Sequence, residues 1–257
     1  MLKSKIVNII FIITLGLVLI CDQWANVPGS LYMVICCAYV GIQAYGSAVP
    51  SAEFFVPVQC AGPSASRAVS LTFDDGPVSG QTDEILRILR SYNTPAAFFC
   101  IGHKIKDNHD LIKKMHAEGH LICNHSYWHG YTFDLQSAGK IEKELADTDQ
   151  QIHQAIGLKP AFFRPPYGVT NPMVAKAIVK RKYVTVGWSI RSFDTVIHDG
   201  DKLMQKITKS LKAGDVILLH DQSVTMVTIL PALLEHIAAI GLKIVRLDEL
   251  LKEPAYA

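Results

Sequence analysis

Two adjacent carboxylates, Asp74 and Asp75, follow a short apolar run and are themselves followed by Gly76-Pro77. The run, residues 69–73, is rich in β-branched and aromatic side chains, which favour a strand, and Gly-Pro ends it. The carboxyl ends of strands are where α/β folds hold their chemistry, and carboxylates there can bind a metal or accept a proton. The structural alternative is a turn that caps a helix, because Asp and Gly favour turns.

Residues further along the chain favour the chemical interpretation. His125 and His129 follow one apolar run at a spacing of four, and Arg164 and His220 end two others. One Asp with two His residues is a donor set for a first-row divalent metal. Three alternatives stay open: a surface pair of histidines on a helix, a surface cation at Arg164, and a simple strand end at His220.

Composition limits the classes of partner. The 257 residues are 49% hydrophobic and carry a net charge of +2 without a basic or acidic block, so the charge pattern gives no support to nucleic-acid binding. Neither a GxGxxG nor a GxxxxGK loop occurs, so nucleotide cofactors have no support either. The six cysteines include no CxxC pair, which argues against a cysteine metal site and leaves a Cys100–Cys123 disulfide open.

Two apolar runs near the N-terminus, residues 6–21 and 31–49, account for the positive mean hydropathy of +0.22. Each run is close to the ~20 residues that a membrane-spanning helix needs. We therefore expect residues 1–49 to form a helical hairpin that anchors the chain in a membrane. A signal peptide is the alternative, because Lys3 and Lys5 precede the first apolar run.

The same two lysines bear on the side of the membrane. They favour an N-terminus on the inside, and the segment between the two apolar runs contains no Lys or Arg. Two spans would return the rest of the chain to the cytoplasmic side. One span, or a cleaved signal, would place it outside, so the sequence leaves the side open.

The rest of the chain divides into a linker, residues 50–66, and one domain, residues 67–257. The linker contains a single strand candidate at residues 54–58. In the domain, strand-like runs alternate with helical segments, which implies βα units and a parallel sheet. The expected strands are residues 69–73, 96–101, 121–124, 161–164, 183–188, 215–220 and 243–245. The expected helices are residues 82–92, 106–118, 135–157, 171–180, 201–211 and 224–240, with Thr82 and Asn171 as caps of the first and fourth.

From about residue 68 to 250 the chain resembles the NodB-type polysaccharide deacetylases, carbohydrate esterase family 4. The resemblance rests on elements that occur in order, namely Thr72-Phe73-Asp74-Asp75-Gly76-Pro77, His125-Ser126-Tyr127-Trp128-His129, Arg164-Pro165-Pro166-Tyr167 and Leu218-Leu219-His220. It implies an α/β fold, a distorted (β/α)7-type barrel preceded here by the membrane hairpin. It also implies hydrolysis of N-acetyl, or sometimes O-acetyl, groups on a polysaccharide.

The resemblance also implies roles for individual residues. Asp74 would be the general base, oriented by Arg164, and His220 the general acid. Asp75, His125 and His129 would hold a divalent metal, with Zn2+ as the first choice and Co2+, Ni2+ or Mn2+ also acceptable to such a site. The substrate contacts would be the Tyr167 backbone N–H toward the oxyanion, together with Pro166, Trp188 and Leu218 around the acetyl group.

One element departs from the family pattern. Many relatives carry an Asp three residues after the Trp-Ser start, whereas here Trp188-Ser189 leads to Arg191. The carboxylate that usually tunes the acid histidine is therefore missing from its place. Two interpretations stay open: Asp194 replaces it, or Arg191 binds an anionic group of the substrate.

The sequence thus predicts a membrane-anchored, metal-dependent hydrolase that removes N-acetyl groups from an N-acetylglucosamine-containing polysaccharide, with peptidoglycan and chitin-like oligomers as candidates. A bacterial-type inner membrane is expected, and such a substrate favours the envelope side. The alternatives are a metal-dependent amidase for a non-sugar amide and a noncatalytic glycan-binding module.

Overall fold

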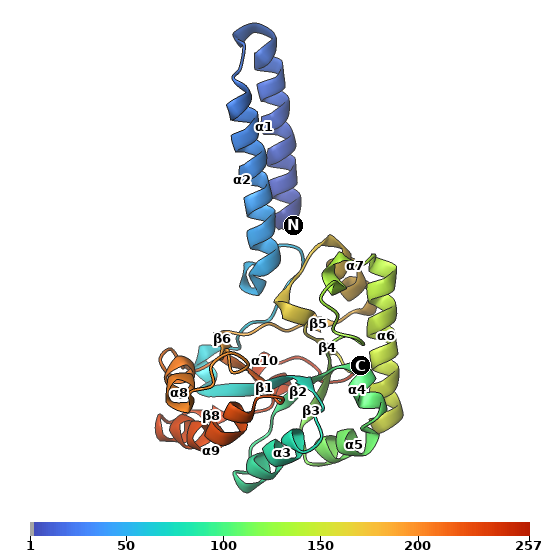
Figure 1. Cartoon of the computed structure of the whole chain (residues 1–257), viewed down its shortest axis with the longest axis vertical. Coiled ribbons are helices and arrows are strands. Elements are labelled where there is room, and N and C mark those ends of the chain that lie inside the picture. The colour runs from blue at the N-terminus through green and yellow to red at the C-terminus, as the bar shows by residue number, and fades with distance from the viewer. Residues whose placement is uncertain (1–2) are drawn as a thin grey trace.

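The computed structural model describes residues 3–257 as two antiparallel helices standing on an α/β unit (Figure 1). Helix α1 spans Lys3–Ala25 and helix α2 spans Gly29–Ala48. Most of their apolar side chains point outward, and Ile12, for example, is 67% exposed. Both helices are long and apolar enough to cross a membrane, which agrees with the expected hairpin.

The two helices satisfy each other's polar groups. Asn8 Oδ1 accepts hydrogen bonds from the Tyr39 hydroxyl at 3.1 Å and from Gln43 Nε2 at 2.8 Å. The Tyr39 ring also stacks on Phe11, with centroids 4.0 Å apart. Polar side chains in a hydrocarbon environment need such partners on a neighbouring helix. These contacts therefore pair α1 with α2 as one hairpin.

The α/β unit is built on an eight-stranded sheet. Its strands are β1 Ala68–Gly76, β2 Ala97–Cys100, β3 Leu121–Asn124, β4 Phe162–Phe163, β5 Val184–Thr185, β6 Ile190–Arg191, β7 Val216–His220 and β8 Lys243–Ile244. The strand order is β5-β4-β3-β2-β1-β7-β6, with β8 beside the start of β1, and every pair is parallel. The curled parallel sheet confirms the expected α/β fold and the distorted barrel.

Helices cover the outside of the sheet (Figure 1). They are α3 Gln81–Ser91, α4 Gly102–Lys106, α5 His109–Ala117, α6 Ala138–Ile156, α7 Pro172–Arg181, α8 Gly200–Thr208, α9 Val224–Ala239 and α10 Leu247–Leu251. All six expected helices are present, and Asn171 caps α7 as predicted, by accepting from the backbone of Met173 and Val174. The prediction for Thr82 was wrong. Gly80 is the N-cap of α3, and the Thr82 hydroxyl donates instead to Asp221 at 2.7 Å.

The expected strand at residues 54–58 was also wrong. Those residues form no strand, although Phe54, Val56 and Val58 are buried. The chain pairs only afterwards, where Gln59 bridges to Val186 beyond β5 and Ala61 bridges to Asp215 before β7. The β-branched and aromatic side chains of this segment are therefore buried, although its backbone does not add a strand to the sheet. The two-residue strand β6 and the five-residue helix α10 had not been predicted at all.

Both ends of the hairpin contact the α/β unit. The Ser4 N–H donates to the Phe54 carbonyl at 3.1 Å, and the Thr170 N–H donates to the Ser47 carbonyl at 3.1 Å. The turn between α1 and α2 lies at the far end (Figure 1). If both helices span a bilayer, the start of α1 and the α/β unit therefore share one side.

This arrangement predicts where two epitope tags will lie. A tag inserted after Asn26, in the turn, is expected on the opposite side of the membrane from a tag placed after Ala257. Protease protection in right-side-out and inverted vesicles measures both. Digestion of the two tags from the same side would exclude a spanning hairpin, and loss of the Asn26 tag from the mature protein would show signal cleavage.

Candidate active site

The alternation of strand β1 selects the face to which its polar residues point. Leu71 and Phe73 enter the core between the sheet and its outer helices, so Thr72 and Asp74 point to the other face, inside the barrel. Regular alternation would turn Asp75 away from Asp74. The backbone of Asp75 instead adopts a left-handed conformation with φ 72°, at a shift in register between Asp74 and Gly76. This local break lets both carboxylates reach one site.

Arg164 holds Asp74 in place. Its side chain is completely buried, and Nη1 donates to Asp74 Oδ1 at 2.6 Å and to Thr72 Oγ1 at 2.9 Å. Nη2 donates to the Gly187 carbonyl at 2.7 Å, and the guanidinium lies 4.1 Å above the Phe99 ring. Charge-assisted hydrogen bonds of this kind are short and fix the orientation of the carboxylate. The expected partnership of Arg164 with Asp74 is therefore present in the structure.

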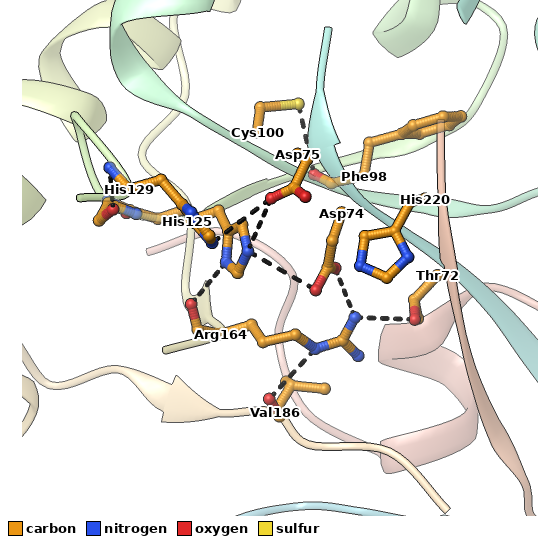
Figure 2. A network of polar contacts seen from close by, with 12 residues as sticks. Thr72, Asp74, Asp75, Phe98, Cys100, His125, His129, Arg164, Val186 and His220 are labelled. Carbon is orange, nitrogen blue, oxygen red and sulfur yellow. Dashed lines mark hydrogen bonds and ion pairs between the residues drawn. The ribbon is translucent and has the colours of Figure 1, made fainter. Parts of the chain in front are cut away.

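The two histidines converge on Asp75 (Figure 2). Their Nε2 atoms lie 3.5 Å (His125) and 3.4 Å (His129) from Asp75 Oδ1. His125 Nδ1 lies 2.8 Å from the Arg164 carbonyl, which can only accept, so the proton is on Nδ1 and the lone pair of Nε2 faces Asp75. Asp75 Oδ1 is buried and has no hydrogen-bond partner among residues 3–257.

These atoms fit a divalent metal. The donor atoms of Asp75, His125 and His129 all lie within 4.8 Å of one another. Ligand bonds of about 2.0–2.1 Å in a tetrahedral zinc site place two donors roughly 3.3 Å apart, close to the separations seen here. An unpaired buried carboxylate oxygen and a histidine lone pair aimed at one point are the features of such a site.

Protonation also favours a metal. Burial, helped by the neighbouring His125, lowers the pKa of His129 to about 4. Burial alone raises the pKa of Asp75, but the neighbouring histidines outweigh it, so the pKa lies well below its usual range. Metal ligands must be deprotonated, and both shifts keep these donors deprotonated at neutral pH.

His220 lies on the other side of Asp74 from His125 (Figure 2). It is the register partner of Asp74 across β1 and β7. Its Nδ1 lies 2.7 Å from Asp194 Oδ1, and its backbone N–H donates to Asp194 Oδ2 at 2.8 Å. Burial lowers the pKa of His220, yet the hydrogen bond and charge of Asp194 outweigh this, and the net shift is upward. Asp194 itself is buried and accepts from Ser192 Oγ at 2.8 Å.

Arg191 does not pair with Asp194, the partner of His220, but points to the edge of the site. Its guanidinium lies 5.5 Å from the Trp188 ring and 4.7 Å from the Phe193 ring. Of the two interpretations of the altered Trp-Ser element, the geometry thus places Asp194 on the histidine and leaves Arg191 at the surface of the site.

A cavity of about 210 Å³ connects these groups. Tyr167, Trp188 and Leu218 line it, as expected, together with the metal-site residues, Asp74 and His220. Pro166 is buried and lies outside the lining. Gly168 must be glycine here, because its φ is +72° and a Cβ would lie 2.3 Å from the Trp188 ring.

Sequence reasoning missed two contacts to Asp75. Gln222 Nε2 donates to Asp75 Oδ2 at 3.0 Å, and Lys104 Nζ donates to the Asp75 carbonyl at 2.8 Å. Gln222 follows His220 by two positions, so its place at a strand end was the available signal. Nothing near Lys104 in the sequence indicated its role. Cys100 and Cys123, left open as a disulfide, are free and buried.

Comparisons with known proteins agree with this geometry. A family model described as polysaccharide deacetylase matches residues 61–186. A peptidoglycan-N-acetylglucosamine deacetylase of Bacillus cereus is 33% identical over 196 residues, 74% of this chain and 91% of the relative. A chitooligosaccharide deacetylase of Rhizobium leguminosarum bv. trifolii is 34% identical over 166 residues, 65% of this chain and 76% of the relative.

A solved structure shares the fold as well. The crystal structure of a peptidoglycan N-acetylglucosamine deacetylase bound to a naphthalenyl N-oxidanyl-benzamide superposes with a TM-score of 0.74. It is 26% identical, and the match covers 77% of this chain and 94% of that one.

The buried pair of Arg164 and Asp74 predicts a stability effect. Arg164→Met leaves an uncompensated buried carboxylate, so we expect it to lower the free energy of unfolding by about 3 kcal/mol or more. Arg246→Met, which removes a half-exposed pair with Asp248, is the matched control and is expected to cost less than about 1 kcal/mol. Urea denaturation of the metal-free protein in detergent measures both.

The double variant Asp74→Asn, Arg164→Met tests the cause. Removing both charges should recover much of the loss, because no ionised group is then left unpaired. Equal costs for the Arg164 and Arg246 variants would contradict the assignment.

Proposed function

We propose that this chain, which belongs to the NodB-type polysaccharide deacetylases of carbohydrate esterase family 4, removes N-acetyl groups from an N-acetylglucosamine-containing glycan. One observation carries the proposal. A carboxylate held by Arg164 and a histidine held by Asp194 face one cavity beside the Asp75–His125–His129 donor set. The relatives' names, peptidoglycan and chitooligosaccharide deacetylases, indicate the substrate class.

Amide hydrolysis needs a nucleophile and a stabilised oxyanion. Asp75, His125 and His129 would hold a divalent metal, which would supply Lewis acidity and lower the pKa of a water beside it to about 7. Asp74 accepts the proton of the attacking water, because Arg164 keeps its Oδ1 occupied and leaves Oδ2 free for that work. The Tyr167 backbone N–H, which has no acceptor among residues 3–257, is available to donate to the oxyanion.

The departing amine needs a proton. His220 Nδ1 is held by Asp194, so its Nε2 is the atom that can donate to the sugar nitrogen. The raised pKa keeps a larger fraction of the imidazole protonated near neutral pH. Asp194 acts through His220 and is therefore a positioning residue.

The parts of the chain fit this activity as follows. Residues 67–257 form the catalytic domain, residues 50–66 join it to the anchor, and residues 1–49 anchor it in a membrane. Zn2+ is the metal we propose, because the donors are two imidazoles and one carboxylate.

Acetate release tests the proposal. The full chain in detergent, supplied with Zn2+, is expected to release acetate from an N-acetylglucosamine oligomer and to lose this activity with a chelator. His129→Gln removes one ligand, so Zn2+ affinity should fall by at least the roughly 10–100-fold that loss of an outer-sphere partner costs. Zinc content after dialysis and acetate yield are measured together.

His103→Gln is the matched control, because His103 contacts Trp128 outside the donor set. It should retain both zinc and activity. Release of no acetate from chitin oligomers and peptidoglycan, with zinc bound, would favour the glycan-binding module or the non-sugar amidase instead.

Asp194→Asn is expected to move the basic limb of the pH–rate profile. Asp194 raises the pKa of His220, and the acid form of His220 is lost as pH rises through that pKa. Without the carboxylate charge the pKa falls, so activity should decline at a lower pH than in the unaltered protein. Arg191→Gln should leave the limb in place, since Arg191 does not contact His220. A basic limb unchanged by Asp194→Asn would exclude the positioning role.

A further inference from the structure

A second hollow, of about 380 Å³, lies beside the catalytic cavity at the foot of the hairpin. One wall is the chain that leaves α2, residues 48–51, and the opposite wall is residues 188–191 with Lys206 of α8. Trp188 and Arg191 line both this hollow and the catalytic cavity. The two spaces therefore meet around a single indole ring.

The lining of the hollow is cationic. It contains Arg191 and Lys206, together with the serines 51, 189 and 210, and no carboxylate. Neither cation forms an ion pair in the part of the chain that the structure describes; each is instead held against the Phe193 ring, at 4.7 Å for Arg191 and 5.3 Å for Lys206. Aromatic contact positions a cation without neutralising it. Ser189 Oγ already donates to Asp215, but the two uncompensated cations together with the hydroxyls of Ser51 and Ser210 match a phosphate.

The hollow also lies where a lipid headgroup would be. Helix α2 ends at Ala48, and Tyr45, three residues before that end, is 62% exposed. The foot of α2 is fixed to the rim of the active site, because Ser47 Oγ donates to the Thr170 carbonyl at 2.5 Å and Thr170 N–H donates back to the Ser47 carbonyl. A hairpin in a bilayer would therefore hold this hollow at the membrane surface.

We propose that the hollow binds the phosphate or diphosphate of a glycan that is attached to a membrane lipid. The phosphate lies between Arg191 and Lys206, the lipid enters the bilayer beside α2, and the sugars pass Trp188 into the catalytic cavity. This inference rests on the deacetylase function proposed above and names its substrate class: a phosphate-linked glycolipid rather than a finished polymer. A soluble sugar phosphate has the same anion without the lipid.

Three substrates with the same N-acetylglucosamine unit distinguish a lipid-linked phosphate from a soluble one. They are a prenyl-diphosphate-linked sugar in vesicles, a soluble sugar 1-phosphate, and a neutral chitin oligomer. With the full chain in vesicles, we expect kcat/KM to be highest for the lipid-linked sugar and about tenfold or more above that for the neutral oligomer. Lys206→Gln should lower that ratio about tenfold, the usual effect of losing one charge-assisted hydrogen bond. Lys202→Gln, on the same helix but outside the hollow, should not change it.

Two outcomes would overturn the inference. One is equal kcat/KM for lipid-linked and neutral substrates. The other is a sugar 1-phosphate used as well as the lipid-linked sugar, which would leave an anion site with no role for the lipid.

A binding measurement keeps the inference testable if no glycan is deacetylated. Trp188 borders the hollow, so its fluorescence, in a Trp24→Phe, Trp128→Phe background, reports inorganic diphosphate bound to the metal-free full chain. Weaker binding in Lys206→Gln, with no change in Lys202→Gln, supports the anion site even where the deacetylase proposal has failed. If Lys206→Gln binds diphosphate as tightly as the unaltered protein, the anion site is refuted, whether or not the protein deacetylates a glycan.

Discussion

The site depends on one buried cation. The guanidinium of Arg164 is out of contact with water, and removing it from water costs several kcal/mol that only a full set of acceptors offsets. Those acceptors come from β1 and from the chain after β5, namely Asp74, Thr72 and the carbonyls of residues 186 and 187. The carbonyl of Arg164 in turn fixes the tautomer of His125. The orientation of the proposed base and the tautomer of a proposed metal ligand therefore depend on the same residue.

Strand β1 divides the chemistry into two halves. On one side the neighbouring histidines lower the pKa of Asp75, while on the other Asp194 raises the pKa of His220. Asp74 lies between them, within 3.6 Å of His125 and in register with His220. The two shifts favour a deprotonated donor for a metal on one side of the cavity and a proton donor on the other. The central place of β1 in the sheet makes this separation possible, because His220 comes from the neighbouring strand β7 on one side, while His125 and His129 follow β3, two strands away on the other.

The sequence could predict the features of the site that depend on local patterns, but not those that depend on contacts between distant segments. Asp74, Asp75, His125, Arg164 and His220 were found because each lies at the end of an apolar run, and parallel strands bring those ends together. The partner of His220 could not be chosen between Asp194 and Arg191, because the choice depends on how the loop after β6 returns, and a two-residue strand has no periodicity to detect. The strand predicted at residues 54–58 was wrong for a related reason. Side chains typical of strands indicate that a segment is buried, but they do not show whether its backbone pairs with another strand.

The buried segment after α2 has a mechanical consequence. A flexible linker would let the catalytic domain turn freely above a membrane, so that its cavity met glycans at any height. Here Val56 and Val58 pack into the core of the domain, and Phe54 packs against Gly46 of α2. Gln59 and Ala61 pair with the sheet, and Ser47 is hydrogen-bonded to the loop that follows Tyr167. The hairpin is thus continuous with the barrel, and this packing fixes the angle between the hairpin and the cavity. If the hairpin spans a bilayer, the cavity is held at one height above the lipid surface, and this fixed height favours the lipid-linked substrate proposed above.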